Sequence, residues 1–121
     1  MKGEYAMVVQ GLYIMEIASM LTGMHPQTLR KYERAGLIKP QRNNSRRMYS
    51  DEDIGRLKYI RFLSEELGLN LAGIKLVLEL REFLDDLKKE IEFLNLDRSV
   101  RERLDALLNN ILKSITEEKP G

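Results

Sequence analysis

The stretch MHPQTLRKYERAGLIKP, residues 24–40, decides the fold of this chain. Pro26 suits the first position of a helix, because its missing N–H is not needed there, and this places His25 at the N-cap. The apolar residues that follow recur at helical spacing, and Gly36 is the kind of residue that ends a helix. The pattern therefore predicts a short helix from Pro26 to Ala35.

One side of this predicted helix is basic. Gln27, Lys31 and Arg34 recur at spacings of four and three, so they share a face. Amide and guanidinium groups match the base edges in the major groove of DNA, which is wide enough for one helix. The residues of this helix that we expect to contact DNA are His25, Gln27, Thr28, Arg30, Lys31, Tyr32 and Arg34.

Three of these residues have competing interpretations. Tyr32 could equally be a core tyrosine packed beneath the helix, and Arg30 could form an ion pair with Glu33. His25 could act only as the cap of the helix. The basic face as a whole fits DNA binding better than these local interpretations do.

A second helix is predicted immediately before this one. From Tyr13, apolar residues recur at spacings of three and four, and Gly23 ends the pattern. Two short helices joined by a turn that contains glycine form a helix-turn-helix. Residues 1–12 show no period, and we expect them to form a flexible N-terminal arm.

The residues after the basic helix break the helical period. The segment LIKPQRNNSRRMY, residues 37–49, predicts a short β-hairpin, or wing, with its tip near Asn43 to Ser45. Such a wing would reach the DNA backbone or the minor groove. The wing residues that we expect to contact DNA are Arg42, Arg46, Arg47 and Tyr49.

The C-terminal third carries a leucine-rich helical pattern. Ser50 and Asn70 are predicted N-caps of two further helices, which complete a DNA-binding domain of residues 13–80. Residues 81–121 are a predicted helical dimerisation region, either one kinked helix or two helices joined near residues 95–99, with Asp97 or Ser99 as a cap. The expected coiled-coil positions are Leu80, Leu84, Leu87, Ile91, Leu94, Val100, Leu104, Leu107 and Ile111.

Charge is distributed unevenly along the 121 residues. The net charge is only +1, but residues 25–49 hold seven basic residues and one acid, whereas residues 64–97 hold nine acids and four basic residues. A positive block of this kind attracts polyanions. An ordinary solvated charged face is the alternative, but it does not explain why the neutralising acids lie elsewhere.

The composition gives no support to catalysis, a cofactor or a membrane segment. The chain has one histidine and no cysteine, and it contains neither a glycine-rich phosphate loop nor an H-E-x-x-H pattern. No apolar run approaches the roughly 18 residues of a membrane span. We therefore expect a non-enzymatic protein of the cytoplasm, mainly α-helical, without metal or cofactor.

Several motifs together resemble the MerR-type winged-helix regulators. They are TLRKYERAGLIKP (residues 28–40), RRMYS (residues 46–50) and GLNLAGIK (residues 68–75), within a match over about residues 12–80. The phrases HPQTLR and NLAGIK are most similar to the branch of heat-shock repressors called HspR. The wing departs from that branch, because Met48 stands inside the R-R-Y-S pattern and leaves Arg46 and Arg47 as rivals for the arginine of the R-x-Y pair.

The resemblance implies a function. It implies a homodimeric repressor of chaperone genes that binds an inverted repeat in double-stranded DNA, with the chaperone DnaK as a co-repressor. It assigns DNA contacts to Arg30 and Tyr32 and phosphate contacts to Arg47 and Tyr49. The alternatives are a MerR-type regulator of another regulon, for example of nitrogen metabolism, a small-molecule-sensing activator, and a protein-interaction module that acts through the C-terminal helix.

Overall fold

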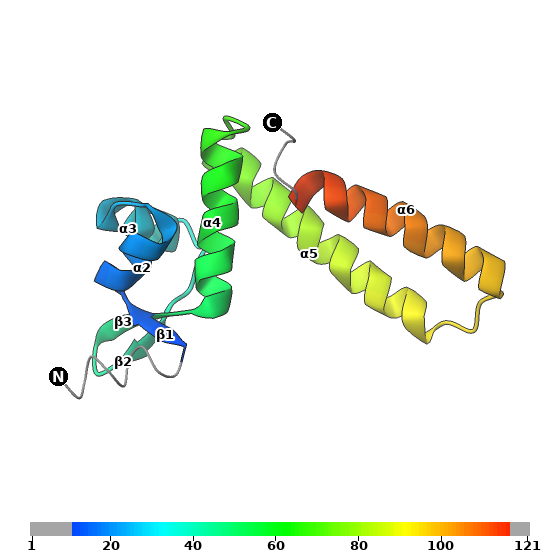
Figure 1. Ribbon diagram of the computed structural model, residues 1–121, viewed down its shortest axis with the longest axis horizontal. Coiled ribbons are helices and arrows are strands. Elements are labelled where there is room, and N and C mark those ends of the chain that lie inside the picture. The colour runs from blue at the N-terminus through cyan, green and yellow to red at the C-terminus, as the bar shows by residue number, and fades with distance from the viewer. Residues whose placement is uncertain (1–10, 117–121) are drawn as a thin grey trace. The chain divides into compact units, whose positions relative to one another are not determined.

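The computed structural model of the protein describes residues 11–116 and consists mainly of helices with one small sheet (Figure 1). By contacts the chain divides into two compact units, one up to Gly68 and one from Leu69 onward. The elements in order are β1 (Leu12–Ile14), α2 (Met15–Thr22), α3 (Pro26–Arg34), β2 (Gln41–Asn43), β3 (Arg46–Ser50), α4 (Asp51–Glu65), α5 (Leu71–Phe93) and α6 (Arg98–Thr116).

The first unit is a winged helix-turn-helix. Its three strands form an antiparallel sheet in the order β1-β3-β2, and β2 and β3 are the predicted wing hairpin. The helices α2 and α3 form the predicted helix-turn-helix, with the turn at Gly23 in the left-handed conformation, φ +70°. The core of this unit is apolar and is led by Leu29, Ile38, Met48, Leu57, Ile60 and Leu63.

The start of the first unit differs from the prediction. Tyr13 and Ile14 were expected to open a helix, but they lie in β1, where Tyr13 pairs with Tyr49 and Ile14 with Met48 of β3. The Tyr13 hydroxyl donates a hydrogen bond of 2.6 Å to Asp51. Aromatic and β-branched residues favour strands, and here pairing with a distant strand outweighs the local helical pattern. Of the predicted arm, residues 1–10 lie outside the described residues.

The helix α4 begins with a capping box. The Ser50 hydroxyl accepts from the Asp53 backbone N–H at 3.0 Å, and the Asp53 carboxylate accepts from the Ser50 N–H at 3.0 Å. Two backbone donors that the helix itself cannot satisfy are therefore paired. The structure confirms the predicted cap and attaches the start of α4 directly to the last residue of the wing.

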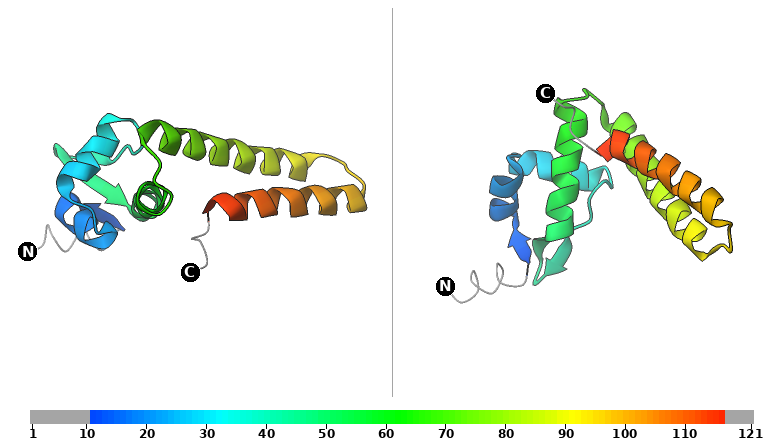
Figure 2. Two further views of the ribbon diagram at one scale, coloured as in Figure 1. Left: turned by 90° about the horizontal axis from the view of Figure 1, so that it is seen from above. Right: turned by 45° about the vertical axis from the view of Figure 1, so that its right-hand side comes forward.

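The second unit is an antiparallel pair of helices, α5 and α6, which lie side by side in all views (Figures 1 and 2). Of the two predicted alternatives, the structure has two helices, joined by residues 94–97. Asn70 caps α5 through its side chain, which accepts from the Gly73 N–H at 2.9 Å. Leu84, Ile91 and Leu108 form a buried cluster between the two helices, and Leu96, Leu104, Leu112 and Ile115 pack against it.

The junction between α5 and α6 is fixed by polar side chains. Asp97 caps α6, because its carboxylate accepts from the Ser99 N–H at 3.1 Å and from the Ser99 hydroxyl at 2.8 Å. Of the two predicted caps, the structure therefore has Asp97, and Glu102 pairs with Arg98 at 3.0 Å. The Arg101 guanidinium donates to backbone oxygens of Ile91, Glu92 and Leu94, and so satisfies carbonyls at the end of α5. No helix within residues 11–116 is long and apolar enough to cross a membrane.

Candidate nucleic-acid interface

The helix α3 is held at both ends by conventional caps. His25 has an extended backbone, and its Nδ1 accepts from the Gln27 N–H at 3.0 Å, so the predicted N-cap is confirmed. Pro26 occupies the first helical position. At the other end Gly36 has φ +76°, which is the left-handed conformation that ends many helices.

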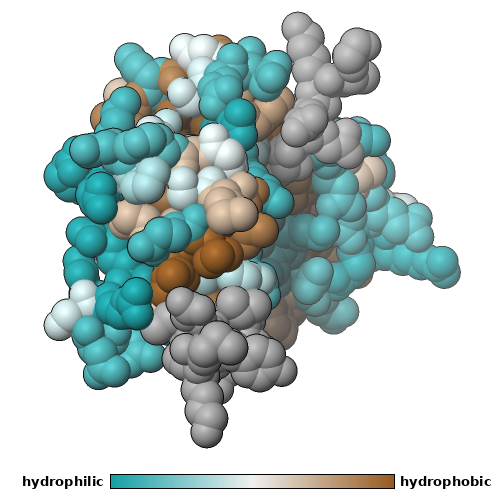
Figure 3. All heavy atoms as spheres, turned by 60° about the vertical axis from the view of Figure 1, so that its left-hand side comes forward, coloured by the Kyte–Doolittle hydropathy of each residue, from teal (hydrophilic) through white to brown (hydrophobic). Residues whose placement is uncertain are grey.

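The two faces of α3 differ sharply. Leu29 is fully buried, and Tyr32 is 4% exposed, so this face packs into the core of the first unit. The opposite side carries the polar residues of the helix. Of these, Gln27, Lys31 and Arg34 are exposed, and Thr28 and Arg30 are half-buried; the cap residue His25 is also exposed. Figure 3 shows the side of the first unit that lies at the left of Figure 1, with many hydrophilic side chains around a smaller hydrophobic area.

The wing turns tightly at Asn44 and Ser45. Both residues have positive φ, 53° and 68°, which fits a two-residue hairpin turn whose twist matches that of the strands. Arg46 follows the turn, is exposed and lies opposite Asn43. Arg47 lies opposite Arg42 on the neighbouring strand.

The register of β3 distinguishes between the two candidate arginines of the R-x-Y pair. Successive side chains of a strand point to opposite faces, so Arg47 and Tyr49 share a face and Arg46 points the other way. Met48 is buried at 1% exposure, so it is an inward-pointing strand residue and does not displace Arg47 from the pattern.

Glu33 connects α3 to the wing. Its carboxylate oxygen Oε1 accepts from Arg47 Nε at 2.5 Å, and Oε2 accepts from Arg42 Nη2 at 3.3 Å. The alternative that Glu33 pairs with Arg30 is wrong, since its oxygens face the wing. The sequence contained no signal for this contact, because the partners lie nine and fourteen residues away.

Two predicted contact residues are buried. The ring of Tyr32 lies in the core, as the competing interpretation held, and the fully buried Tyr49 pairs with Tyr13 across the sheet. Neither ring presents a free surface, because Tyr32 is 4% exposed and Tyr49 is fully buried. Burial raises the pKa of Tyr49, and the nearby Glu33 carboxylate raises it further, so the phenol stays protonated. Within residues 11–116 its hydroxyl has no hydrogen-bond partner.

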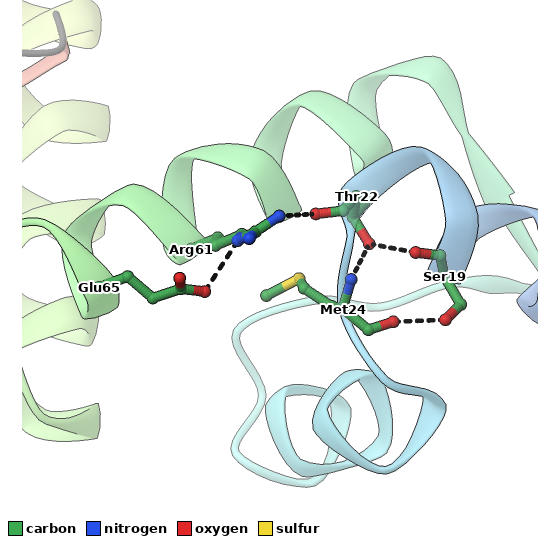
Figure 4. Close-up of polar contacts among 5 residues, drawn as sticks. All are labelled: Ser19, Thr22, Met24, Arg61 and Glu65. Atoms are coloured by element: carbon green, nitrogen blue, oxygen red, sulfur yellow. Dashed lines mark hydrogen bonds and ion pairs between the residues drawn. The ribbon is translucent and has the colours of Figure 1, made fainter.

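Two arginines of α4 hold the backbone on either side of α3. Arg61 Nη1 donates to the Thr22 carbonyl at 2.8 Å, while its Nε pairs with Glu65 at 2.8 Å (Figure 4). Arg56 Nε donates to the Leu37 carbonyl at 2.6 Å. The Thr22 carbonyl lies at the end of α2, just before the turn to α3, and the Leu37 carbonyl lies just after α3, so α4 holds the backbone on both sides of α3. Sequence reasoning missed both roles, and the only hint was their place within the apolar stretch of α4.

The turn before α3 is also closed by short local bonds. The Thr22 hydroxyl donates to the Ala18 carbonyl at 2.8 Å and accepts from the Met24 N–H at 3.3 Å. The Ser19 hydroxyl donates to the Met24 carbonyl, so the turn is tied to α2 from both sides (Figure 4). These bonds leave little freedom in the angle between α2 and α3.

The predicted dimerisation residues fall into two groups. Leu84 and Ile91 are buried against the chain's own α6, and Leu104 packs beside them. The others are exposed, namely Leu80, Leu87, Leu94, Val100, Leu107 and Ile111.

Most of the large exposed apolar residues of the second unit, though not Phe93, form one surface. On α5, Leu76 and Phe83 continue the row of Leu80, Leu87 and Leu94 at spacings of four, three and seven. In each helix the exposed apolar residues are rotated about the helix axis, by roughly a fifth of a turn and in the same sense, from the residues buried between α5 and α6. Because α5 and α6 are antiparallel and face each other, this equal rotation brings the exposed apolar residues of both helices to the same side of the pair. We call this surface the apolar face of the hairpin: Leu76, Leu80, Phe83 and Leu87 on α5, Leu94 just after α5, and Val100, Leu107 and Ile111 on α6.

Within residues 11–116 no three histidine or acidic side chains gather in a way that could hold a metal ion. The exposed polar side chains of α3 and the wing include the amide of Gln27 and the cationic groups of Lys31, Arg34 and Arg46. Such side chains can bind an extended anion by hydrogen bonds and charge.

Comparison with known proteins matches residues 13–80 to the family described as MerR HTH family regulatory protein. Over 78 residues the chain is 45% identical to the heat shock protein HspR of Streptomyces coelicolor, a match that covers 64% of this chain and 52% of that protein. It is 38% identical over 72 residues to the HTH-type transcriptional regulator GlnR of Bacillus anthracis, covering 59% of this chain and 55% of GlnR.

A third relative, the HTH-type transcriptional regulator YyaN of Bacillus subtilis, is 28% identical over 104 residues, which cover 84% of this chain and 75% of YyaN. The matches to HspR and GlnR span about half the length of those proteins. The family match covers more than half of this chain and includes both helices of the helix-turn-helix, the wing and α4. The chain belongs to the MerR HTH family of transcriptional regulators.

Proposed function

We propose that the protein is a homodimeric transcriptional regulator that binds an inverted repeat in double-stranded DNA through α3 and the wing. The observation that carries the proposal is the two-sided character of α3. Its apolar side is buried in the core, while Gln27, Lys31 and Arg34 stand exposed on the other. An exposed helix of this composition fits the major groove.

The contacting groups have separate roles. Gln27 and Arg34 are suited to base edges, because amides pair with adenine and guanidinium groups with guanine. Lys31 and Arg46 carry exposed positive charge for phosphates. The α4 arginines would serve indirectly, since they hold the backbone at the two ends of α3.

The apolar face of the hairpin supports the dimer. Four large side chains of α5, Leu94 just after it, and three side chains of α6 are exposed on one side of this unit, and Phe83 and Leu76 are 63% and 66% exposed. A contiguous apolar patch of this kind marks an interaction surface. A second copy of the chain would offer the same face, and a two-fold pair of DNA-binding units then matches an inverted repeat.

The regulated genes are proposed to be heat-shock or chaperone genes. The likeness to HspR, at 45% identity, supports this over another regulon such as nitrogen metabolism. If the protein regulates heat-shock or chaperone genes, the chaperone DnaK is its proposed co-repressor. Binding to a duplex from upstream of a chaperone operon, strengthened by added DnaK, is the expected result. Equal binding to a duplex from upstream of a glutamine synthetase gene would contradict the assignment.

The test of the DNA-binding role is a pair of double variants. Lys31→Ala with Arg34→Ala removes two charges from α3, and Lys39→Ala with Lys58→Ala removes two exposed charges elsewhere in the same unit. Fluorescence anisotropy on the target duplex should show a loss of at least roughly tenfold for the first pair, since the base contact of Arg34 is worth about 1–3 kcal/mol and a phosphate contact of Lys31 is lost with it. If both pairs lose the same affinity, α3 is not the reading helix.

A further inference from the structure

Glu33 is the one acid in the basic block of residues 25–49, and it lies between α3 and the wing. It is partly buried, with 21% of its side chain exposed, and it accepts from Arg47 Nε at 2.5 Å and from Arg42 Nη2 at 3.3 Å. A carboxylate that accepts two charge-assisted hydrogen bonds from two strands is a specific contact rather than a loose surface pair.

The position of the two arginines explains why an acid is needed there. Arg42 and Arg47 are direct cross-strand partners in the wing. Like charges placed opposite each other on neighbouring strands destabilise a hairpin. Glu33 lies where its two oxygens can reach both guanidinium groups, so it offsets this repulsion and attaches the wing to α3.

The geometry also determines which donors remain. Glu33 takes the Nε–H of Arg47 and one Nη of Arg42. An arginine has five N–H donors in a planar fork, so both Nη groups of Arg47 stay available while the plane of the guanidinium is fixed. Among the described residues no hydrogen bond is seen from these Nη groups. They are donors suited to a phosphate.

We propose that Glu33 is a positioning residue, which orients Arg47 and Arg42 so that the wing grips the DNA backbone only in the register set by α3. This inference rests on the proposed DNA-binding function. With Glu33 in place, the side chains of Arg42 and Arg47 have a fixed orientation. Their positive charge, which would attract DNA of any sequence, is partly neutralised. Glu33 would therefore raise the discrimination between the target and other sequences, and not the overall affinity.

The variant that tests this is Glu33→Gln, which keeps the size of the side chain and removes its charge. Its matched control is Glu16→Gln, which removes an exposed negative charge from α2. Both are titrated against the target duplex and a scrambled duplex over a salt series, and both are checked for thermal stability.

For Glu33→Gln we expect a several-fold rise in affinity for the scrambled duplex. Its log affinity should fall more steeply with log salt, by about 0.9 for each phosphate that a released arginine reaches. The ratio of target to scrambled affinity should fall by roughly tenfold, the worth of one charge-assisted hydrogen bond. Glu16→Gln should leave the ratio unchanged. An equal rise on both duplexes would overturn the proposal, because it would make Glu33 a mere competitor of phosphate, and so would a result identical to the control.

A second measurement needs no DNA. In the unmodified protein the Arg47 Nε–H should give a separate, slowly exchanging signal in the ¹⁵N–¹H spectrum, since it is bonded to a carboxylate. The signal should merge with those of free arginines in Glu33→Gln. If the signal is the same in both proteins, the proposal fails even where DNA binds. If the signal behaves as expected but the unmodified protein binds neither duplex, the proposed function fails, and the inference about discrimination fails with it.

Discussion

Gly23 and Gly36 stand at the two ends of α3, and both have positive φ, +70° and +76°. A Cβ at position 23 would lie 2.1 Å from Arg61 Nη1, whereas a Cβ at position 36 would meet nothing within 4 Å. The two glycines therefore share a backbone requirement and differ in their neighbours. A substitution at Gly36 therefore measures backbone strain alone, whereas one at Gly23 measures the strain together with the loss of the Arg61 contact.

We predict that Gly36→Ala costs about 1–2 kcal/mol in the free energy of unfolding, from backbone strain alone. Gly23→Ala should cost roughly 2–4 kcal/mol, because the same strain is joined by displacement of the Arg61 bond to the Thr22 carbonyl. Urea denaturation of both variants measures the two values. Equal costs would show that Arg61 does not fix the turn.

At the scale of single residues, the ends of helices could be predicted from the sequence, but contacts between residues distant in the chain could not. His25, Pro26 and Gly36 follow local rules of helix ends, so the bounds of α3 could be predicted from them. The partners of Glu33 could not, because they depend on which strand residues the hairpin brings opposite α3. The burial of Tyr49 likewise follows from pairing with β1, an element that has only three residues.

The turn of the wing contains a residue in an unfavourable conformation. Ser45 has φ +68°, which a residue with a Cβ adopts at a cost, whereas asparagine tolerates the φ of 53° at Asn44. Ser45→Gly should therefore stabilise the protein by about 0.5–1 kcal/mol, the strain relieved less the entropy that glycine loses on folding. Thermal unfolding measures this, and Asn44→Gly is the control, with a smaller effect. A destabilised Ser45→Gly would contradict the assigned turn.

The start of α6 gives a prediction about pH. Hydrogen bonds from the Ser99 hydroxyl and backbone hold the pKa of Asp97 below its usual value. A carboxyl group whose pKa is lower in the folded chain stabilises it above its unfolded pKa, and this contribution is lost as the pH falls through the lowered value. Asp97→Asn still caps a helix but does not titrate there.

We therefore expect the melting temperature of the unmodified protein to fall more steeply than that of Asp97→Asn as the pH drops below about 4, the usual aspartate value. Above that pH the two proteins should differ by a nearly constant amount. Melting curves followed by circular dichroism at a series of pH values make the comparison. Parallel curves across the acidic range would mean that Asp97 is not held by Ser99.

Among the elements, the helices could be predicted best. Ser50, Asn70 and Asp97 lie where a cap was expected, and the residues between them keep a helical period. The sequence did not determine which C-terminal leucines pack within the chain and which are left for contact with another chain. A pattern of leucines on two sides of a helix fits both an intrachain hairpin and a coiled coil. The structure uses Leu84 and Ile91 for the hairpin and leaves the neighbouring row exposed.

The apolar face of the hairpin makes a prediction for the assembled protein. Phe83→Glu places a charge at the centre of this face, where dimerisation would bury it without a partner. The dissociation constant of the dimer should rise by at least roughly a hundredfold, as for other central interface residues. Ala106→Glu adds the same charge at an exposed position off the apolar face and should leave the dimer intact. Sedimentation equilibrium measures both.

A monomeric unmodified protein would contradict the dimer and would favour the view that the apolar face binds a different protein. Dimerisation also determines how DNA is read. One winged helix covers one half-site, and only a two-fold pair of them matches an inverted repeat. Phe83→Glu should therefore weaken binding to the target duplex more than binding to a single half-site.

The most direct measurement is fluorescence anisotropy of the purified protein on DNA from upstream of its own gene, beside a scrambled duplex, across a salt series. We predict tight binding to the native fragment, two chains per duplex, and a fall of log affinity with log salt of several units, about 0.9 for each phosphate contacted. Equal and weak binding to both duplexes, with affinity nearly independent of salt, would contradict this prediction.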